Sequence, residues 1–120
     1  MATQELLQQI KGEQDFEREV LKEELPVIAD FYADWCGPCR VVAPVIESLS
    51  REYAGRARFV KVNVDNNERI ASRYVVESIP TVIVFSKGQA VERVVGVSSQ
   101  QAYRQRIDKA LSGSASGRRD

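Results

Sequence analysis

Two cysteines, Cys36 and Cys39, are the residues whose type and spacing most directly offer chemistry in this 120-residue chain. Gly37 and Pro38 separate them, Trp35 precedes them, and an apolar run typical of a buried strand comes just before. We expect a helix to begin here, because proline is tolerated in a first helical turn. The unpaired N–H groups and the dipole of that turn would stabilise a thiolate on Cys36. One helical turn would place Cys39 behind it, where the two sulfurs could bond without unfolding the helix.

Three less specific interpretations of the same cysteines stay open. They could be half of a metal site, but the chain has no histidine and no third cysteine, so such a site would need a metal-bridged dimer. They could form a purely structural disulfide, although so short a loop restricts the unfolded chain little. They could also be two inert core thiols. We favour the redox interpretation because the pair stands where a predicted strand ends and a predicted helix begins.

Composition excludes several other classes of function. Without histidine, Ser-His-Asp and Cys-His catalysis and histidine-ligated metals are excluded. The 17 basic and 17 acidic residues cancel, so no general attraction to nucleic acid or to an anionic membrane is expected. No apolar run is long enough for a membrane span, and the first residues lack the features of a signal peptide. We therefore expect a cytoplasmic protein with no metal, no cofactor, no nucleic-acid partner and no membrane partner.

Hydrophobic periodicity predicts alternating helices and strands. The expected elements are, in order, a helix over 14–24, a strand over 27–33, a helix from the cysteines to about Tyr53, a strand over 59–64, a short helix ending at Tyr74, strands over 81–85 and 90–97, and a helix from Ser98 or Ser99 that carries Leu111. The segment before Gly12 is either a short helix or an edge strand. Asp65–Asn67 is expected to turn the chain and cap the short helix.

These elements predict an α/β fold in a single domain over residues 1–111. Helices that cross between the early strands imply parallel pairing, whereas the last two strands form an antiparallel hairpin. The result is a mixed central β-sheet flanked by helices on both faces. Residues 112–120 are almost without apolar side chains, so we expect a disordered C-terminal tail there.

The Trp35-Cys36-Gly37-Pro38-Cys39 signature occurs together with Asp30 upstream of it, Lys61 in the next strand, Ile79-Pro80-Thr81, Gly88 and Gly96. With these residues the sequence resembles the thioredoxin family. The resemblance covers about residues 14–111, and Ser78 departs from it, because many members have glycine there. It implies the thioredoxin fold, protein-disulfide reductase activity, disulfide-containing substrate proteins, a flavin-containing thioredoxin reductase as electron donor, and a monomer.

The resemblance also suggests a role for each cysteine and for two charged residues. Cys36 would attack a partner's disulfide and Cys39 would resolve the mixed disulfide. Asp30 stands in an apolar strand, so burial should raise the pKa of its carboxyl and allow it to accept a proton from Cys39. Lys61 on the neighbouring strand would oppose that rise. The alternatives are a surface or structurally paired aspartate and an ordinary solvated lysine.

A docking face is expected around the cysteines. The resemblance implies a cis Ile79–Pro80 bond, which would leave the backbone of Ile79 free to pair with an extended substrate segment. Trp35 could instead be ordinary core. The expected face consists of Trp35, Gly37, Pro38, Ile79, Pro80, Val95 and Gly96. Two other functions stay open, an oxidase or isomerase of the same family and a binding module in which the cysteines are dispensable.

Overall fold

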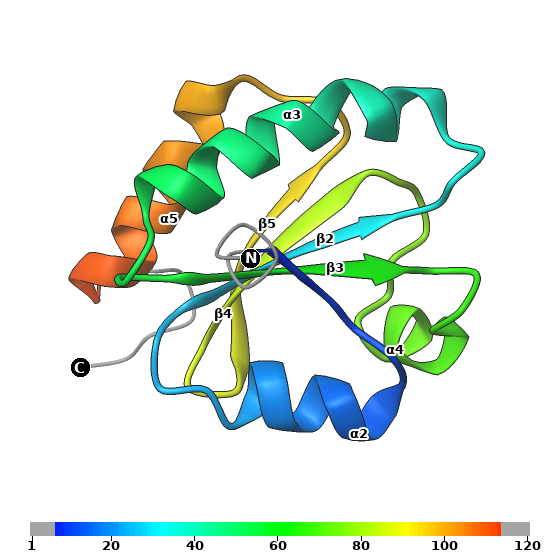
Figure 1. Ribbon diagram of the computed structural model, residues 1–120, viewed down its shortest axis with the longest axis horizontal. Helices are drawn as coiled ribbons and strands as arrows, with labels where there is room; N and C mark the ends of the chain where they lie inside the picture. The colour runs from blue at the N-terminus through cyan, green and yellow to red at the C-terminus, as the bar shows by residue number, and fades with distance from the viewer. Residues whose placement is uncertain (1–6, 114–120) are drawn as a thin grey trace.

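A five-stranded mixed sheet forms the centre of the structure, a computed structural model that describes residues 7–113 (Figure 1). The strands are β1 (Leu7–Gln9), β2 (Val27–Tyr32), β3 (Arg58–Asn63), β4 (Thr81–Ser86) and β5 (Gln89–Val95), and they lie in the order β1-β3-β2-β4-β5. β1 and β2 both run parallel to β3, whereas β4 runs antiparallel to β2 and β5. The predicted mixed sheet is confirmed, and of the two alternatives for the segment before Gly12 the edge strand is the one observed.

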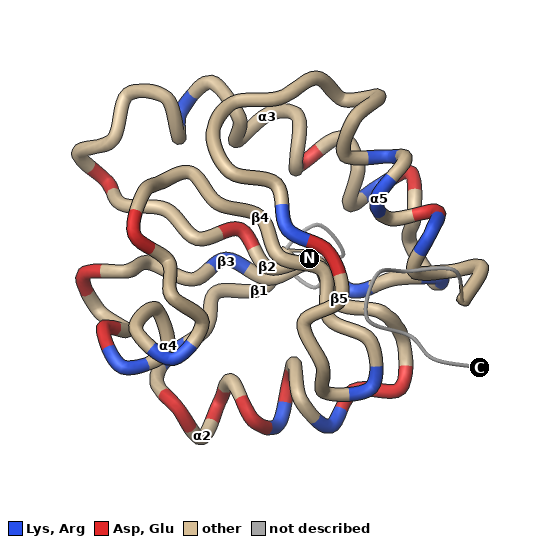
Figure 2. The backbone as a smooth tube through the Cα atoms, turned by 180° about the vertical axis from the view of Figure 1, so that it is seen from behind, with Lys and Arg blue, Asp and Glu red and all other residues tan. Residues whose placement is uncertain are grey.

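Helices cover both faces of this sheet (Figure 1). They are α2 (Glu13–Phe16), which continues into the π-helix η1 (Glu17–Leu21), α3 (Gly37–Glu52), α4 (Glu68–Arg73) and α5 (Gln100–Ser112). α3 and α5 lie on one face, and α2 and α4 lie on the other, which the view from behind also shows (Figure 2). Ser112, the first residue of the expected disordered tail, is instead the last residue of α5. The rest of that tail beyond Gly113 lies outside the described residues. No helix within residues 7–113 is long and apolar enough to cross a membrane.

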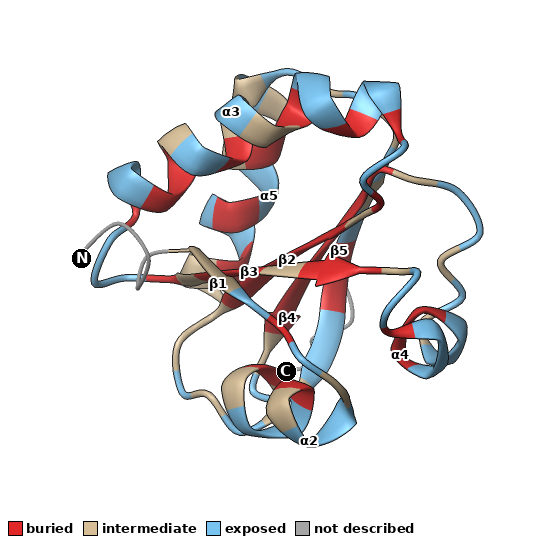
Figure 3. Ribbon diagram, turned by 45° about the vertical axis from the view of Figure 1, so that its right-hand side comes forward, coloured by how far each residue is buried: buried red, intermediate tan, exposed pale blue. Residues whose placement is uncertain are grey.

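The side chains of β2 alternate between two hydrophobic cores, which is why its sequence reads as an almost unbroken apolar run. Ile28 packs with α3 and α5, while Val27, Ala29 and Phe31 pack with α2, η1 and α4. β2 and β4 are accordingly buried along most of their length (Figure 3). The same alternation puts Asp30 on the face of Ile28, under α3. A carboxyl is thereby held inside the apolar layer on which α3 rests.

The first helix ends earlier than its sequence predicts. The expected helix over 14–24 stops at Leu21, ahead of the Leu25–Pro26 step. The Glu23 carboxylate accepts a hydrogen bond from the Leu25 N–H at 3.1 Å and pairs with Arg58 at 2.8 Å. These two contacts turn the chain toward the start of β3, so the helix ends before the proline can end it.

Asn67 and Ser99 both occupy helix N-caps, but they bond differently. Ser99 caps α5, and its hydroxyl accepts a hydrogen bond from the Ala102 N–H at 3.1 Å. The cap of α4 falls at Asn67, within the segment expected to cap it, but the Asn67 amide makes no capping hydrogen bond. It accepts a hydrogen bond from the Gly12 N–H and donates one to the Asn63 carbonyl, each at 2.9 Å. Asn67 therefore fastens the start of α2 to the end of β3.

Gly88 is required by both its conformation and its neighbour. It lies at φ +84° in the β4–β5 turn, and a Cβ there would stand 3.0 Å from the Leu21 carbonyl oxygen. We expect Gly88→Ala to lower the free energy of unfolding by about 1–3 kcal/mol in urea titrations. Gly55→Ala is the matched control, because Gly55 has φ +86° but open space around it. Equal losses for the two variants would show that the contact with Leu21 contributes nothing.

Candidate active site

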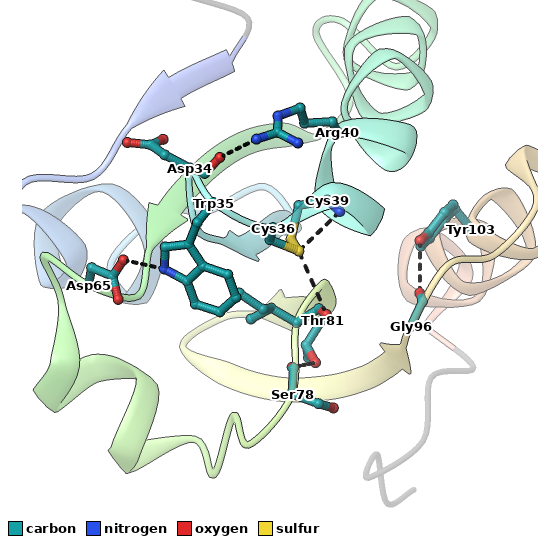
Figure 4. The surroundings of a disulfide bond; sticks show 11 residues. Asp34, Trp35, Cys36, Cys39, Arg40, Asp65, Ser78, Thr81, Gly96 and Tyr103 are labelled. Carbon is teal, nitrogen blue, oxygen red and sulfur yellow. Dashed lines mark hydrogen bonds between the residues drawn. A yellow bond between two sulfur atoms is a disulfide. The ribbon is translucent and has the colours of Figure 1, made fainter.

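The β2–α3 turn places the two cysteines at the start of a long helix (Figure 4). Cys36 is the N-cap residue of α3, and its extended backbone (φ −89°, ψ 109°) leads the chain from the strand into the helix. Pro38 stands in the first turn, where its missing N–H costs no helical hydrogen bond. Cys36 and Cys39 are joined as a disulfide with their Cα atoms 5.3 Å apart. The sequence pattern thus produced the predicted sulfur pair.

The sulfur of Cys36 lies among backbone dipoles. The Cys39 N–H donates a hydrogen bond to Cys36 Sγ at 3.1 Å, and the first turn of α3 contains no acidic residue. An N–H aimed at sulfur and the positive end of a 16-residue helix both favour a thiolate once the disulfide is reduced. The exposed fractions of Cys36 and Cys39 in the oxidised form are 3% and 5%, so exposure does not distinguish them. The difference between them lies in what each sulfur faces.

A proline turn packs against the Cys36 side of the pair. Cys36 Sγ lies 3.9 Å from the carbonyl oxygen of Ile79, and the Ile79–Pro80 bond is cis, as the resemblance implies. Thr81 holds this turn, since its hydroxyl donates to the Ser78 carbonyl at 2.7 Å. β4 begins only at Thr81, so Ile79 lies ahead of the strand. The backbone beside the sulfur is therefore outside the sheet ladder.

Trp35 is a surface residue, which excludes its interpretation as core. The residue is 68% exposed, and its indole N–H donates a hydrogen bond to Asp65 Oδ2 at 2.8 Å (Figure 4). Asp65 was expected only to turn the chain, so its contact with Trp35 is one that sequence reasoning missed. A signal for it exists, because Asp65 follows β3 and Trp35 follows β2, and parallel neighbours end at the same edge of a sheet. The hydrogen bond orients the ring next to Cys36.

Asp30 is buried beneath the cysteines. The residue is 2% exposed, and within the described part of the chain its Oδ1 has no hydrogen-bond partner. Burial raises the pKa of its carboxyl from 3.8 to about 6, and the charge of Lys61 opposes that rise. This burial excludes the alternative of a surface aspartate, and the bare oxygen argues against a structurally paired one.

A cleft of about 170 Å³ joins Asp30 to the second cysteine. Its lining residues are Asp30, Tyr32, Ala33, Asp34, Cys39, Arg40, Ala43 and Lys61. Lys61 is the register partner of Asp30 on β3 and therefore lies on the same face of the sheet. A larger hollow of about 670 Å³ between β1 and α2 contains none of the residues predicted for the site. Cys39, Asp30 and Lys61 thus share one cleft, on the inner side of the pair.

The remaining predicted residues lie around the Cys36 side. Gly37 and Pro38 are exposed, Ile79 is half-buried and Pro80 is buried. Val95 is 59% exposed at the end of β5. Its register partner is Thr81, and the Gly96 N–H donates to the Pro80 carbonyl at 2.8 Å. The end of β5 is therefore tied to the proline turn that faces the disulfide.

The chemistry available here is thiol–disulfide exchange. Among residues 7–113, no group of three or more His, Cys, Asp or Glu side chains is placed to hold a metal ion. The two sulfurs can alternate between a dithiol and a disulfide as they exchange two electrons with a partner's thiols or disulfide, and a carboxyl of raised pKa lies beside the inner one.

Comparison with known proteins gives a consistent result. The family model described as Thioredoxin matches residues 8–109. Thioredoxin 1 of Nostoc sp. is 46% identical over 96 residues, which cover 80% of this chain and 90% of that one. Thioredoxin M5, chloroplastic, of Oryza sativa is 42% identical over 103 residues, which cover 86% of this chain and 60% of that one. A solved structure of a mutant thioredoxin from Halobacterium salinarum has a TM-score of 0.80 and 36% identity, covering 88% of this chain and 90% of the other.

Proposed function

This chain belongs to the thioredoxin family, and we propose that Cys36 is the attacking thiol and Cys39 the resolving thiol when it reduces disulfides in other proteins as a dithiol–disulfide oxidoreductase. The observation that carries this assignment is the different surroundings of the two sulfurs. Cys36 caps α3, accepts a hydrogen bond from the Cys39 N–H and lies beside the proline turn, whereas Cys39 lines the inner cleft with Asp30. A partner approaching from the Ile79 side therefore meets Cys36.

The exchange moves two electrons from the protein to its substrate. The Cys36 thiolate attacks one sulfur of the substrate disulfide, so a mixed disulfide forms and the other substrate sulfur leaves as a thiolate. Cys39 loses its proton and attacks Cys36 Sγ, which breaks the mixed disulfide and releases the second substrate thiol. The Cys36–Cys39 disulfide remains, in the position seen here. The second attack is fast because its nucleophile is already in place.

Asp30 is the proposed acceptor for the Cys39 proton. A buried thiol ionises reluctantly, and the shared cleft gives the proton a route from Cys39 to the carboxyl, directly or through water. A pKa raised to about 6 lets the carboxyl take up a proton near neutral pH and return it later. Lys61 is proposed to limit that rise.

Substrates are proposed to dock on the face around Cys36. The Ile79 backbone would pair with an extended segment of the substrate, and exposed apolar side chains would contact it without strict demands on its sequence. The exposure of Trp35 and Val95 and the position of Ile79 outside β4 support this. The proposed face is the set Trp35, Gly37, Pro38, Ile79, Pro80, Val95 and Gly96.

We also propose how the oxidised protein is reduced again and in which compartment it acts. A flavin-containing thioredoxin reductase would reduce the Cys36–Cys39 disulfide, as the family membership implies. A monomer suffices, because every residue of the proposed site comes from one chain. A reducing compartment such as the cytoplasm suits a chain whose only two cysteines form the redox pair.

Trapping the mixed disulfide tests the assignment of the two thiols. We expect Cys39→Ser to accumulate a covalent adduct with a disulfide-containing protein, because the resolving attack is removed while Cys36 still attacks. Mass spectrometry would place the bond at Cys36, and NMR shifts in the adduct should gather at Ile79 and Val95. Cys36→Ser is the matched control and should form no adduct. Adduct formation by Cys36→Ser but not by Cys39→Ser would reverse the two roles.

A further inference from the structure

We propose that Tyr32, tethered by Gln9, is a positioning residue that holds the Lys61 ammonium beside the Asp30 carboxyl. The proposal deepens the proton-transfer role of Asp30 and rests on it. It also gives β1, the strand that is hardest to predict, a part in the site. The contacts that carry it run across three neighbouring strands.

The register of the sheet brings four side chains together. Gln9 on β1 is the register partner of Lys61 on β3, and Lys61 is the register partner of Asp30 on β2. Partners in parallel strands face the same side, so these three residues form a row on the α3 side of the sheet. Tyr32 stands two residues after Asp30 and therefore lies on that face as well.

Two contacts fix the ammonium within this row. Lys61 Nζ lies 4.1 Å from the centroid of the Tyr32 ring, within the range of a cation–π interaction. The Gln9 side-chain N–H donates a hydrogen bond to Tyr32 Oη at 2.7 Å, which holds the ring at its hydroxyl end. Lys61 forms no ion pair with a carboxylate of the described residues, so the ring is the contact that locates its charge.

The location of that charge matters because Asp30 has little else to stabilise its ionised form. Its Oδ1 has no hydrogen-bond partner among the described residues, and the Lys61 charge is what opposes the effect of burial on its pKa. Coulombic interaction weakens with distance, and a lysine stem is flexible. Without the ring, the ammonium would spend more time in solvent, and Asp30 would lose part of the charge interaction that lowers its pKa.

The other titratable or charged groups around this cleft are Asp34 on the turn after β2, Cys39 and Arg40 on α3, and Tyr103 on α5.

A coupling measurement tests the proposal. The Asp30 carboxyl is titrated by carbon NMR in the oxidised full-length protein, with and without Lys61→Met, in the wild-type and Tyr32→Leu backgrounds. With Tyr32 present, Lys61→Met should raise the pKa of Asp30. In the Tyr32→Leu background we expect that rise to shrink roughly twofold or more. Comparing the change due to Lys61 within each background removes any direct effect of Tyr32→Leu on the hydration of the cleft.

Two milder variants guard against a loss of fold. Tyr32→Phe keeps the ring and removes only the bond to Gln9, and Gln9→Leu removes the same bond from the other end, so both should give the same intermediate coupling. An equal Lys61-dependent rise with and without the Tyr32 ring would overturn the proposal, as would no rise at all.

The rate of disulfide reduction against pH separates this proposal from the one it rests on. The pH midpoint should move with the pKa of Asp30 in each variant. If NMR shows the coupling but Asp30→Asn leaves the pH profile unchanged, the positioning by Tyr32 stands and the proton-transfer role of Asp30 fails.

Discussion

Replacing Cys36 with serine should reduce disulfide reductase activity by roughly 100-fold or more, to the rate of the chemical reductant alone. A serine hydroxyl does not ionise near neutral pH, so the N–H of Cys39 and the start of α3 would have no thiolate to stabilise. The measurement is reduction of insulin by dithiothreitol, followed by turbidity, with the wild type beside Cys36→Ser.

The controls for this experiment distinguish an enzyme from a scaffold. Cys39→Ser should also fail to turn over, because it can attack but cannot resolve. Circular dichroism should show that both variants keep the fold, since the Cys36–Cys39 loop is too short for its loss to matter greatly to stability. Equal rates for the wild type and Cys36→Ser would remove the assignment of Cys36 as the attacking thiol.

Asp30 should make the protein less stable as the pH rises. The pKa of its carboxyl is about 6 in the folded state against 3.8 as the reference, so folding favours the protonated form. The stability associated with that form is full below about pH 3.8 and is lost as pH rises through about 6. At about 1.4 kcal/mol per tenfold change in proton affinity, the loss amounts to about 3 kcal/mol. Asp30→Asn, which cannot ionise, should escape it.

Urea unfolding of the oxidised protein between pH 3.5 and 8 provides the measurement. We expect the stability of Asp30→Asn relative to the wild type to rise by about 3 kcal/mol across this range. Lys61→Met is the informative control, because removing its charge should raise the pKa of Asp30 further and enlarge the pH dependence. Parallel stability curves for Asp30→Asn and the wild type would contradict the effect of burial on Asp30.

The same variant has a kinetic consequence. Asp30→Asn should slow disulfide reduction roughly 10-fold or more, because the Cys39 proton loses its acceptor. The slowing should depend on pH between about 6 and 9, where the carboxyl and a thiol titrate. Rates that match the wild type throughout that range would leave Asp30 as a destabilising residue with no part in proton transfer.

Sequence patterns predicted the parts of this structure that depend on local order. Apolar and alternating runs predicted β2, β3, β4 and β5, although not β1, and the position of Cys36 between a strand and a helix placed the sulfur pair at the start of α3. Burial of Asp30 followed from the apolar residues around it. These features depend on neighbours within a few residues, which a pattern can capture.

The contacts missed at the sequence level depend on strand register or on side chains far away in the chain. Gln9, Lys61 and Tyr32 meet only because three strands are aligned in one register. Asp65 reaches Trp35 because β2 and β3 end together. Trp35 itself illustrates the limit, since its large apolar ring fits a core or a surface equally well until its neighbours are known. The early end of the first helix likewise depends on Arg58, which lies 35 residues beyond Glu23.

The placement of both sulfurs within a single helical turn also limits how far the structure can differ between the oxidised and the reduced protein. Their Cα atoms are 5.3 Å apart, close to the separation that neighbouring side chains on any helix already have. Making or breaking the bond therefore calls for no rearrangement of strands or helices. We therefore expect a binding protein that distinguishes the reduced protein from the oxidised one to contact the two sulfurs directly.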